Sequence, residues 1–266
     1  MTEPVPYIPG SPPHKLGPLA RYLPPLPDGV GEAWLRARVE PGSWVLDPFG
    51  AAPRLAVEAA RAGYRVLVAA NNPVARFLLE MEAHPPSAKD LRAALAELAA
   101  TYKGEERMEP HIKGLYETRC KACGATVSAQ AFIWERGAEG PFAKIYHCPE
   151  CGDSGEHPAT EADREKAARF GRVGLHHARA LARVAPPEDP DRAHAEEALS
   201  TYLPRAVYAL ITLINKLDGR SSVSPGLLRN IRALLLAACD RANTLWPYPN
   251  PLSLIHISEP TRLRRI

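Results

Sequence analysis

Four cysteines in two CxxC pairs place the strongest constraint on how this chain can fold. Cys120 and Cys123 form one pair, Cys148 and Cys151 form the other, a glycine follows each pair, and 24 residues separate the pairs. Each pair is typical of a tight turn that directs two thiolates at one ion, and the glycine frees the backbone to make that turn. Four thiolates leave no open coordination position, so the spacing predicts a structural Zn²⁺ in a ribbon over residues 110–155. A redox-active dithiol pair is the alternative.

The composition is that of a globular protein from a reducing compartment. The chain has 266 residues, 45% of them hydrophobic, which is enough to bury a core. No apolar run approaches the roughly 20 residues of a membrane span, and the proline-rich Met1–Gly10 lacks the pattern of a secretory signal. An odd number of cysteines argues against a disulfide framework. We therefore expect a cytoplasmic protein without a membrane partner, and we expect the fifth cysteine, Cys239, to be a buried and inert thiol.

The charge permits a nucleic-acid partner without requiring one. The net charge is +3 and the pI is about 8.6. Basic residues around the predicted ribbon would either contact nucleic acid or form a solvated face. These residues are Lys113, Arg119, Lys121, Arg136 and Lys144. His147 adjoins Cys148 and is expected to be a surface histidine.

A strand–helix–strand pattern lies upstream of the cysteines. Ser43–Asp47 and Arg65–Ala69 are predicted strands, and Ala51–Ala62 is a predicted helix. This order implies a parallel pair, because antiparallel neighbours need no such crossover. Ligands bind beyond the carboxyl ends of parallel strands in α/β proteins, so Asp47 would suit a ligand with an ammonium group. Capping of the following helix by Asp47 is the alternative.

The remaining segments are predicted from prolines and helical periodicity. Residues 1–30 form a proline-rich arm, which is either a loose tail or a segment held to a domain surface by Tyr7, Leu19, Tyr22 and Leu23. Ser87 is expected to open a helix, with Asp90 as its capping partner. Residues 160–250 are a predicted helical region with two apolar stripes. The first stripe holds Val207, Leu210, Ile211, Ile214 and Leu217, and the second holds Leu228, Ile231, Leu235, Ala238 and Ala242.

The C-terminal tail has a different character from the rest of the chain. Leu252–Arg262 reads LSLIHISEPTR, which resembles the translation of a transposon-type sequencing adapter. We therefore expect residues 252–266 to be an artefact that carries no information on the fold. A genuine tail is the alternative.

The segment Val45–Glu80 resembles the S-adenosylmethionine-binding start of the amino-group DNA methyltransferases, which methylate adenine N6 or cytosine N4. The matching residues are Asp47, Pro48, Phe49, Glu58, Gly63, Asn72 and Pro73. The order of an NPVA segment at Asn72, a cysteine ribbon and a PR-type helix at Pro204 is similar to that of adenine-specific DNA methylases that contain a zinc ribbon. His14–Pro24 is similar to the arm that precedes the cofactor motif in such enzymes.

The resemblance implies a fold, a cofactor and a partner. The fold would be α/β, a partial Rossmann-like methyltransferase fold over residues 31–105 with an inserted zinc ribbon and C-terminal amphipathic helices. The cofactor would be S-adenosylmethionine, and DNA would be the partner of the full-length protein. The implied cofactor-binding residues are Asp47, Pro48, Phe49, Gly50, Asn71 and Asn72.

Three departures from the family pattern bear on activity. The turn after Asp47 holds only one glycine, and Ala70 stands where the resemblance implies an acidic residue for the ribose, with Asn71 beside it as a hydrogen-bonding group. No Pro-Pro pair in the chain is followed by an aromatic residue, so the family's catalytic loop is absent. We expect the chain to be an inactive fragment of such an enzyme. The alternative is a non-catalytic zinc-ribbon protein that binds nucleic acid on a degenerate methyltransferase fold.

Overall fold

The protein is a mixed α/β chain that divides into two compact units. The computed structural model describes residues 7–12, 23–24, 26–135, 137–171, 174–219 and 224–245, together with the backbone of 256–260. The first unit comprises Met1–Leu91 and Pro225–Leu234, and the second comprises Arg92–Ser224 and Leu235–Ile266. The helices α4 (Ala88–Ala100) and α10 (Pro225–Arg241) each run from one unit into the other.

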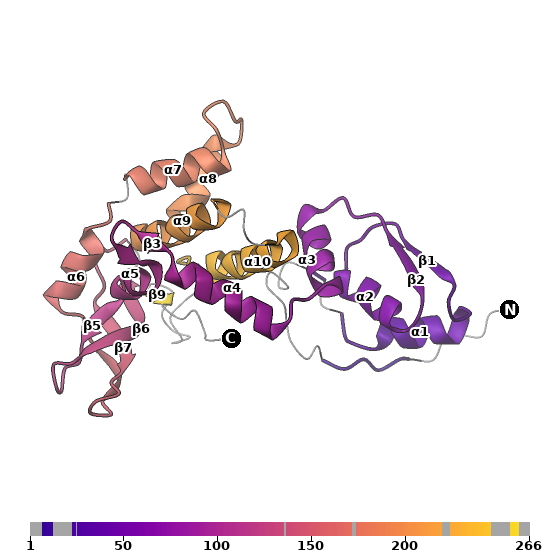
Figure 1. The fold of residues 1–266 in the computed structure, drawn as a ribbon, viewed down its shortest axis with the longest axis horizontal. Coiled ribbons are helices and arrows are strands. Elements are labelled where there is room, and N and C mark those ends of the chain that lie inside the picture. The colour runs from indigo at the N-terminus through magenta and orange to yellow at the C-terminus, as the bar shows by residue number, and fades with distance from the viewer. Residues whose placement is uncertain are drawn as a thin grey trace. The chain divides into compact units, whose positions relative to one another are not determined.

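The first unit is built on one parallel pair of strands (Figure 1). Its elements are α1 (Val30–Arg38), β1 (Trp44–Asp47), α2 (Pro53–Arg61), β2 (Arg65–Val68) and α3 (Pro73–Ala83). β1 pairs with β2 from Trp44 opposite Arg65 to Asp47 opposite Val68. α2 begins at a proline, whose missing N–H costs nothing in the first turn, and Gly63 follows the helix with a φ of 93°. The predicted strand–helix–strand unit is thus confirmed.

One face of this parallel pair is covered by packed side chains, and the other face is exposed to solvent. Leu35, Ala59 and Tyr64 form a buried cluster against which Val45 and Val66 pack from the strands. The opposite face carries three apolar side chains, Trp44, Leu46 and Leu67, that are 68%, 62% and 59% exposed. Since all-parallel sheets are normally covered on both faces, these two strands do not make a complete Rossmann-type sheet. Within the described residues no other parallel pairing occurs, so only the coarser expectation of an α/β protein is confirmed.

The second unit contains an antiparallel ribbon sheet. Its strand order is β5-β6-β7-β8, and β9 pairs with the free edge of β6. The bounds are β5 (Glu117–Arg119), β6 (Thr126–Glu135), β7 (Ala143–His147), β8 (Ser154–Pro158) and β9 (His256–Pro260). A small pair, β3 (Tyr102–Lys103) with β4 (Glu106–Arg107), and the helix α5 (Met108–Gly114) precede the sheet. β9 lies in the tail that resembles an adapter sequence, and the origin of that tail stays a prediction.

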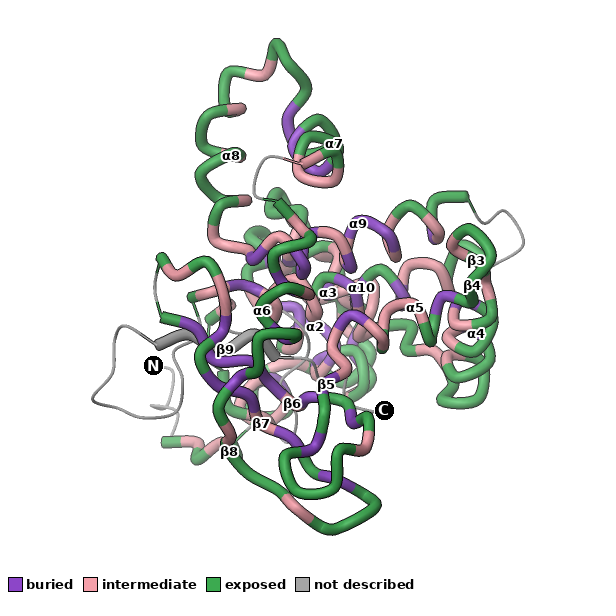
Figure 2. The backbone as a smooth tube through the Cα atoms, turned by 90° about the vertical axis from the view of Figure 1, so that its left-hand side faces the viewer, coloured by how far each residue is buried: buried purple, intermediate pink, exposed green. Residues whose placement is uncertain are grey.

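Helices cover one part of the ribbon sheet. α6 (Glu161–Ala168) and the start of α9 (Pro204–Asp218) pack on the sheet, whereas α7 (Leu175–Val184) and α8 (Arg192–Ser200) pack with α9. Ala129, Phe132 and Trp134 of β6 pack with Ala167 and Leu203, and the end of β6 is accordingly buried in Figure 2. The two predicted apolar stripes fall on α9 and α10, where Val207, Ile211, Leu217, Ile231 and Leu235 are buried. No helix in the described ranges is both long enough and apolar enough to cross a bilayer.

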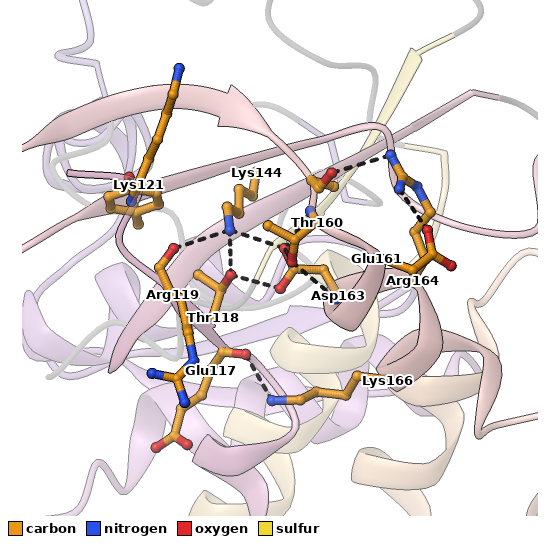
Figure 3. A network of polar contacts seen from close by, with 12 residues as sticks. Glu117, Thr118, Arg119, Lys121, Lys144, Thr160, Glu161, Asp163, Arg164 and Lys166 are labelled. Atoms are coloured by element: carbon orange, nitrogen blue, oxygen red, sulfur yellow. Dashed lines mark hydrogen bonds and ion pairs between the residues drawn. The ribbon is translucent and has the colours of Figure 1, made fainter. Parts of the chain in front are cut away.

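A buried ionic network joins the ribbon to α6 (Figure 3). Lys144 of β7 is 1% exposed, and its Nζ donates to Asp163 Oδ2 at 3.0 Å and to Thr118 Oγ1 at 2.7 Å. Asp163 also accepts from the backbone N–H and the hydroxyl of Thr160, which makes it part of the capping box of α6. Lys166 of α6 donates to the carbonyls of Gly114 and Glu117. The start of α6 is therefore fixed to the sheet by charge-assisted hydrogen bonds.

Two expectations fail in the described residues. Lys144 is not part of a solvated or nucleic-acid-binding face, because its ammonium is enclosed between β5 and α6. Tyr7 does not anchor the N-terminal arm, since its side chain is 90% exposed. Leu19, Tyr22 and Arg136 lie outside the described residues, as do most of His14–Pro24 and most of the tail.

Replacing Lys144 by methionine should destabilise the second unit strongly. The change would leave Asp163 buried without its cation, which costs about 3–5 kcal/mol for a buried pair. Lys113→Met is the matched control, because Lys113 forms a 2.5 Å pair with Glu109 in which both side chains are more than half exposed, and such pairs contribute about 0.3–0.5 kcal/mol. Urea unfolding of the zinc-loaded protein measures both. Equal, small losses for the two variants would contradict the network's structural role.

Candidate metal centre and candidate cofactor edge

Two hairpin ends present the four cysteines. The first pair lies between β5 and β6, and the second lies between β7 and β8. In each turn the glycine amide donates to the carbonyl of the first cysteine at 3.0 Å, Gly124 to Cys120 and Gly152 to Cys148. The two glycines have φ values of 75° and 77°, a region that other residues rarely adopt. The predicted role of these glycines is thereby confirmed.

The four sulfur atoms converge on one point. They all lie within 4.8 Å of one another, with Cys120 Sγ 3.6 Å from Cys151 Sγ and Cys123 Sγ 3.7 Å from Cys148 Sγ. A tetrahedral zinc site with Zn–S bonds of about 2.3 Å requires sulfur separations of about 3.8 Å. Each short contact joins a cysteine of one hairpin to a cysteine of the other, so the cluster ties the two hairpins together. The donor set and its spacing fit a structural Zn²⁺.

The thiols differ in acidity because they crowd one another. Backbone N–H groups, first that of Cys123, lower the pKa of the Cys120 thiol to about 7. The Asp153 amide acts in the same direction on Cys151, but burial and hydrogen bonds with the other three thiols raise the pKa of Cys151 to about 12. One thiolate therefore forms readily, whereas further ones are opposed by their neighbours. A bound divalent cation would relieve this opposition and release the remaining protons.

A tyrosine and an aspartate support the cysteine cluster through hydrogen bonds. Tyr146 is 1% exposed and accepts a 2.8 Å hydrogen bond from the Lys121 amide, while its hydroxyl donates to Asp153 Oδ2 at 2.7 Å. This hydrogen bond is the largest cause that lowers the pKa of the Asp153 carboxyl. His157 stacks on the Tyr146 ring with centroids 4.6 Å apart. Tyr146 therefore connects both knuckles, the role of an outer layer that orients metal ligands.

One sequence feature indicates a residue of this outer layer around the cysteine cluster. Tyr146 precedes Cys148 by two residues, so the two side chains share a face of β7 and both are buried. Asp153 and His157 come from the far side of the hairpin, and only the pairing of β7 with β8 brings them here. His147 is exposed, as expected for a surface residue. Cys239, which we predicted to be buried, is half-buried, and burial raises the pKa of its thiol to about 11.

The candidate cofactor residues gather at the carboxyl edge of β1 and β2. The Ala69 amide donates to the Asp47 carbonyl at 2.9 Å, which places the two strand ends side by side. Asp47 Oδ1 accepts from the amides of Phe49 and Gly50 at 3.1 and 2.9 Å. Asp47 thus shapes the turn, while Pro48 is exposed and the Phe49 ring is 78% exposed.

The end of β2 packs closely against the turn that follows β1. Gly50 is buried with a φ of 55°, and a Cβ on it would lie 2.7 Å from the Cβ of Ala70. Asn72 caps α3, since its Oδ1 accepts from the amides of Val74 and Ala75. Asn71 is exposed beside it. The structure therefore brings the six predicted residues to one edge, where Asn72 caps α3 and Asp47 closes the turn without capping α2, whose N-cap is Ala52.

Zinc analysis of the purified protein should give one ion per chain. Cys148→Ser should lose the ion, because three thiolates and a hydroxyl bind zinc far less well than four thiolates. Cys239→Ser is the matched control and should keep it, since Cys239 lies outside the cluster. Elemental analysis after dialysis against a mild chelator measures both variants. A folded, metal-free wild-type protein would refute the zinc site.

Gly50→Ala should destabilise the first unit more than Gly42→Ala. Both residues have positive φ, which costs about 1–2 kcal/mol for alanine, but the space around a Cβ on Gly42 is empty to 4 Å. At Gly50 the collision with Ala70 should add about 1–3 kcal/mol. Urea unfolding measures the difference. Equal effects would show that the turn is not packed against Ala70.

Comparison with family models, with curated proteins and with solved structures finds no match to this chain. A proposal about its function therefore rests on the residues and contacts described above.

Proposed function

We propose that this chain is part of an S-adenosylmethionine-dependent DNA methyltransferase that acts on an exocyclic amino group, with adenine N6 as the favoured target. The observation that supports this most is the carboxyl edge of β1 and β2, where Asp47–Gly50 lies directly beside Ala69 and Ala70. Edges of this kind are where α/β proteins bind nucleotide-like ligands. The sequence resemblance to the amino-group DNA methyltransferases includes these same turn residues.

The chemistry of this edge suits the parts of S-adenosylmethionine. Asp47 uses Oδ1 for its turn, and among the described residues Oδ2 accepts no hydrogen bond. A carboxylate oxygen is a suitable acceptor for the ammonium of the methionine moiety. The exposed Phe49 ring offers a stacking surface for adenine, and the Asn71 amide can both donate to and accept from ribose hydroxyls.

The zinc ribbon has a structural part in this proposal. Its four thiolates leave no position for a substrate, so it would stabilise the second unit rather than act on DNA chemically. Methyl transfer from sulfonium to an amine depends on positioning and desolvation. Because the chain lacks the Pro-Pro-aromatic loop that would hold the amine, we expect it to bind the cofactor without methylating DNA.

A second candidate is a zinc-ribbon protein that binds nucleic acid without catalysis. Ala70 favours it, because no carboxylate stands at the end of β2 to hold the ribose and the Gly50 backbone packs against Ala70 instead of leaving a gap. Arg119 and Lys121 are exposed at the first knuckle and could contact phosphates.

Calorimetric titration of the zinc-loaded chain with S-adenosylmethionine separates the two candidates. Asp47→Asn keeps an oxygen that can cap the turn but removes the charge, so it should weaken binding by roughly tenfold or more, the usual effect of losing a charged hydrogen bond. Asp90→Asn is the matched control, because Asp90 pairs with Ser87 at the start of α4 and should leave affinity unchanged.

The absence of any heat at millimolar cofactor would sink the methyltransferase proposal. In that case fluorescence anisotropy with labelled DNA tests the second candidate. Binding that Lys121→Gln weakens would support it, and absence of binding would exclude it.

A further inference from the structure

The helical part of the second unit holds a pocket that neither the zinc cluster nor the candidate cofactor edge uses. Its volume is about 340 Å³, which lies within the range of small-ligand sites. The lining comes from the loop after α6, from the first turn of α7, from the end of α8 and from the start of α9 with the residues before it. Its aromatic and basic lining residues include Arg169, Phe170, His176, His177 and Tyr208.

Aromatic rings form a fixed wall of this pocket. The Phe170 ring is tilted against the Tyr208 ring and the His176 ring is perpendicular to it, with centroids 4.9 and 4.5 Å from that of Tyr208. The Tyr208 hydroxyl is 2.7 Å from His111 Nε2, and His111 Nδ1 is 3.0 Å from Glu106 Oε2. The contact with His111 occupies the Tyr208 hydroxyl, so the Tyr208 ring rather than its hydroxyl is offered to the pocket. A ring that neighbouring rings and a hydrogen bond to its hydroxyl already hold in place loses little entropy when a planar ligand stacks on it.

Positive charge lies beside the aromatic wall. The Arg169 guanidinium carries this charge, the His177 ring lines the pocket as a hydrogen-bonding group, and the described lining contains no carboxylate. Burial is the largest cause that lowers the pKa of His176, and the charges of Lys103 and Arg179 lower it further. The neighbourhood is therefore electropositive, and His176 serves as a neutral ring at pH 7. A ligand that fits must be flat and apolar at one end and anionic at the other.

We propose that this pocket binds one nucleotide unit, with its base against the Phe170, His176 and Tyr208 rings and its phosphate at Arg169 and His177. Every base has a π-face that can stack on aromatic side chains, and an arginine guanidinium matches the geometry of a phosphate. A free mononucleotide and one nucleotide of a single strand share this chemistry. The proposal does not depend on the methyltransferase proposal, because the two concern different residues in different units.

The test is calorimetric titration of the zinc-loaded chain with AMP, adenosine, inorganic phosphate and a short single-stranded oligodeoxyadenylate. AMP should bind more tightly than adenosine or phosphate alone. Arg169→Gln should weaken AMP roughly tenfold, as expected for a lost charged hydrogen bond, and should leave adenosine unchanged. Phe170→Leu should weaken AMP and adenosine alike, because it removes a stacking ring.

Arg179→Gln is the matched control. Arg179 is exposed on α7 and does not line the pocket, but its charge acts on His176, so Arg179→Gln should weaken AMP binding much less than Arg169→Gln does. Binding of AMP with this pattern supports a free nucleotide as the ligand. Binding of the oligonucleotide alone, weakened by both Arg169→Gln and Phe170→Leu, supports a strand.

Three results would overturn the proposal. One is the absence of binding by both AMP and the oligonucleotide at millimolar concentration. Another is phosphate binding as tight as that of AMP, which would leave only an anion site. The last is equal weakening by Arg169→Gln and Arg179→Gln, which would indicate nonspecific attraction. Circular dichroism of each variant establishes that it is folded.

Discussion

The convergence of four cysteine sulfurs is the constraint on which the second unit depends. The apolar cluster around the sulfurs contains only Cys120, Val127, Tyr146 and Cys148, with Ala125 beside them. So small a core cannot by itself offset the conformational entropy of two hairpins. In sites of this kind the free energy of metal binding is also free energy of folding. A small apolar core is therefore sufficient for the ribbon, because one bound ion would stabilise it as much as many apolar contacts.

The ribbon is joined to the helices by buried cations as well as by apolar packing. Lys144 reaches Asp163 at the start of α6, and the Arg205 guanidinium of α9 lies between the rings of Tyr116 and Phe132, at 4.8 and 4.6 Å. Burying charges is costly unless every donor is satisfied. Here the partners come from several elements, so the network is satisfied only when sheet and helices are correctly placed. Such contacts contribute more to selecting one arrangement of the sheet and helices than to the free energy of unfolding.

Local patterns in the sequence identified local structure well. The CxxCG turns, the β1–α2–β2 unit and the Ser87–Asp90 cap all depend on residues close in the chain. Contacts set by the register of distant strands could not be identified in this way. Lys144 was read as a surface charge because a lysine between a predicted strand and a knuckle gives no sign of its buried partner, Asp163, 19 residues away. The nucleotide-sized pocket was missed for the same reason, since its wall joins residues from three separate helical segments.

The bare face of the parallel pair bears on how the candidate cofactor edge would work. Trp44, Leu46 and Leu67 are more than half exposed, whereas strands of parallel sheets are normally buried on both sides. Two strands covered on one face hold their carboxyl ends less rigidly than a full sheet does. The local contacts that remain are the Asp47 turn and the close approach of Gly50 to Ala70. Because binding affinity depends on such preorganisation, an edge with few supports should bind S-adenosylmethionine weakly, even where each contacting residue is of the right kind.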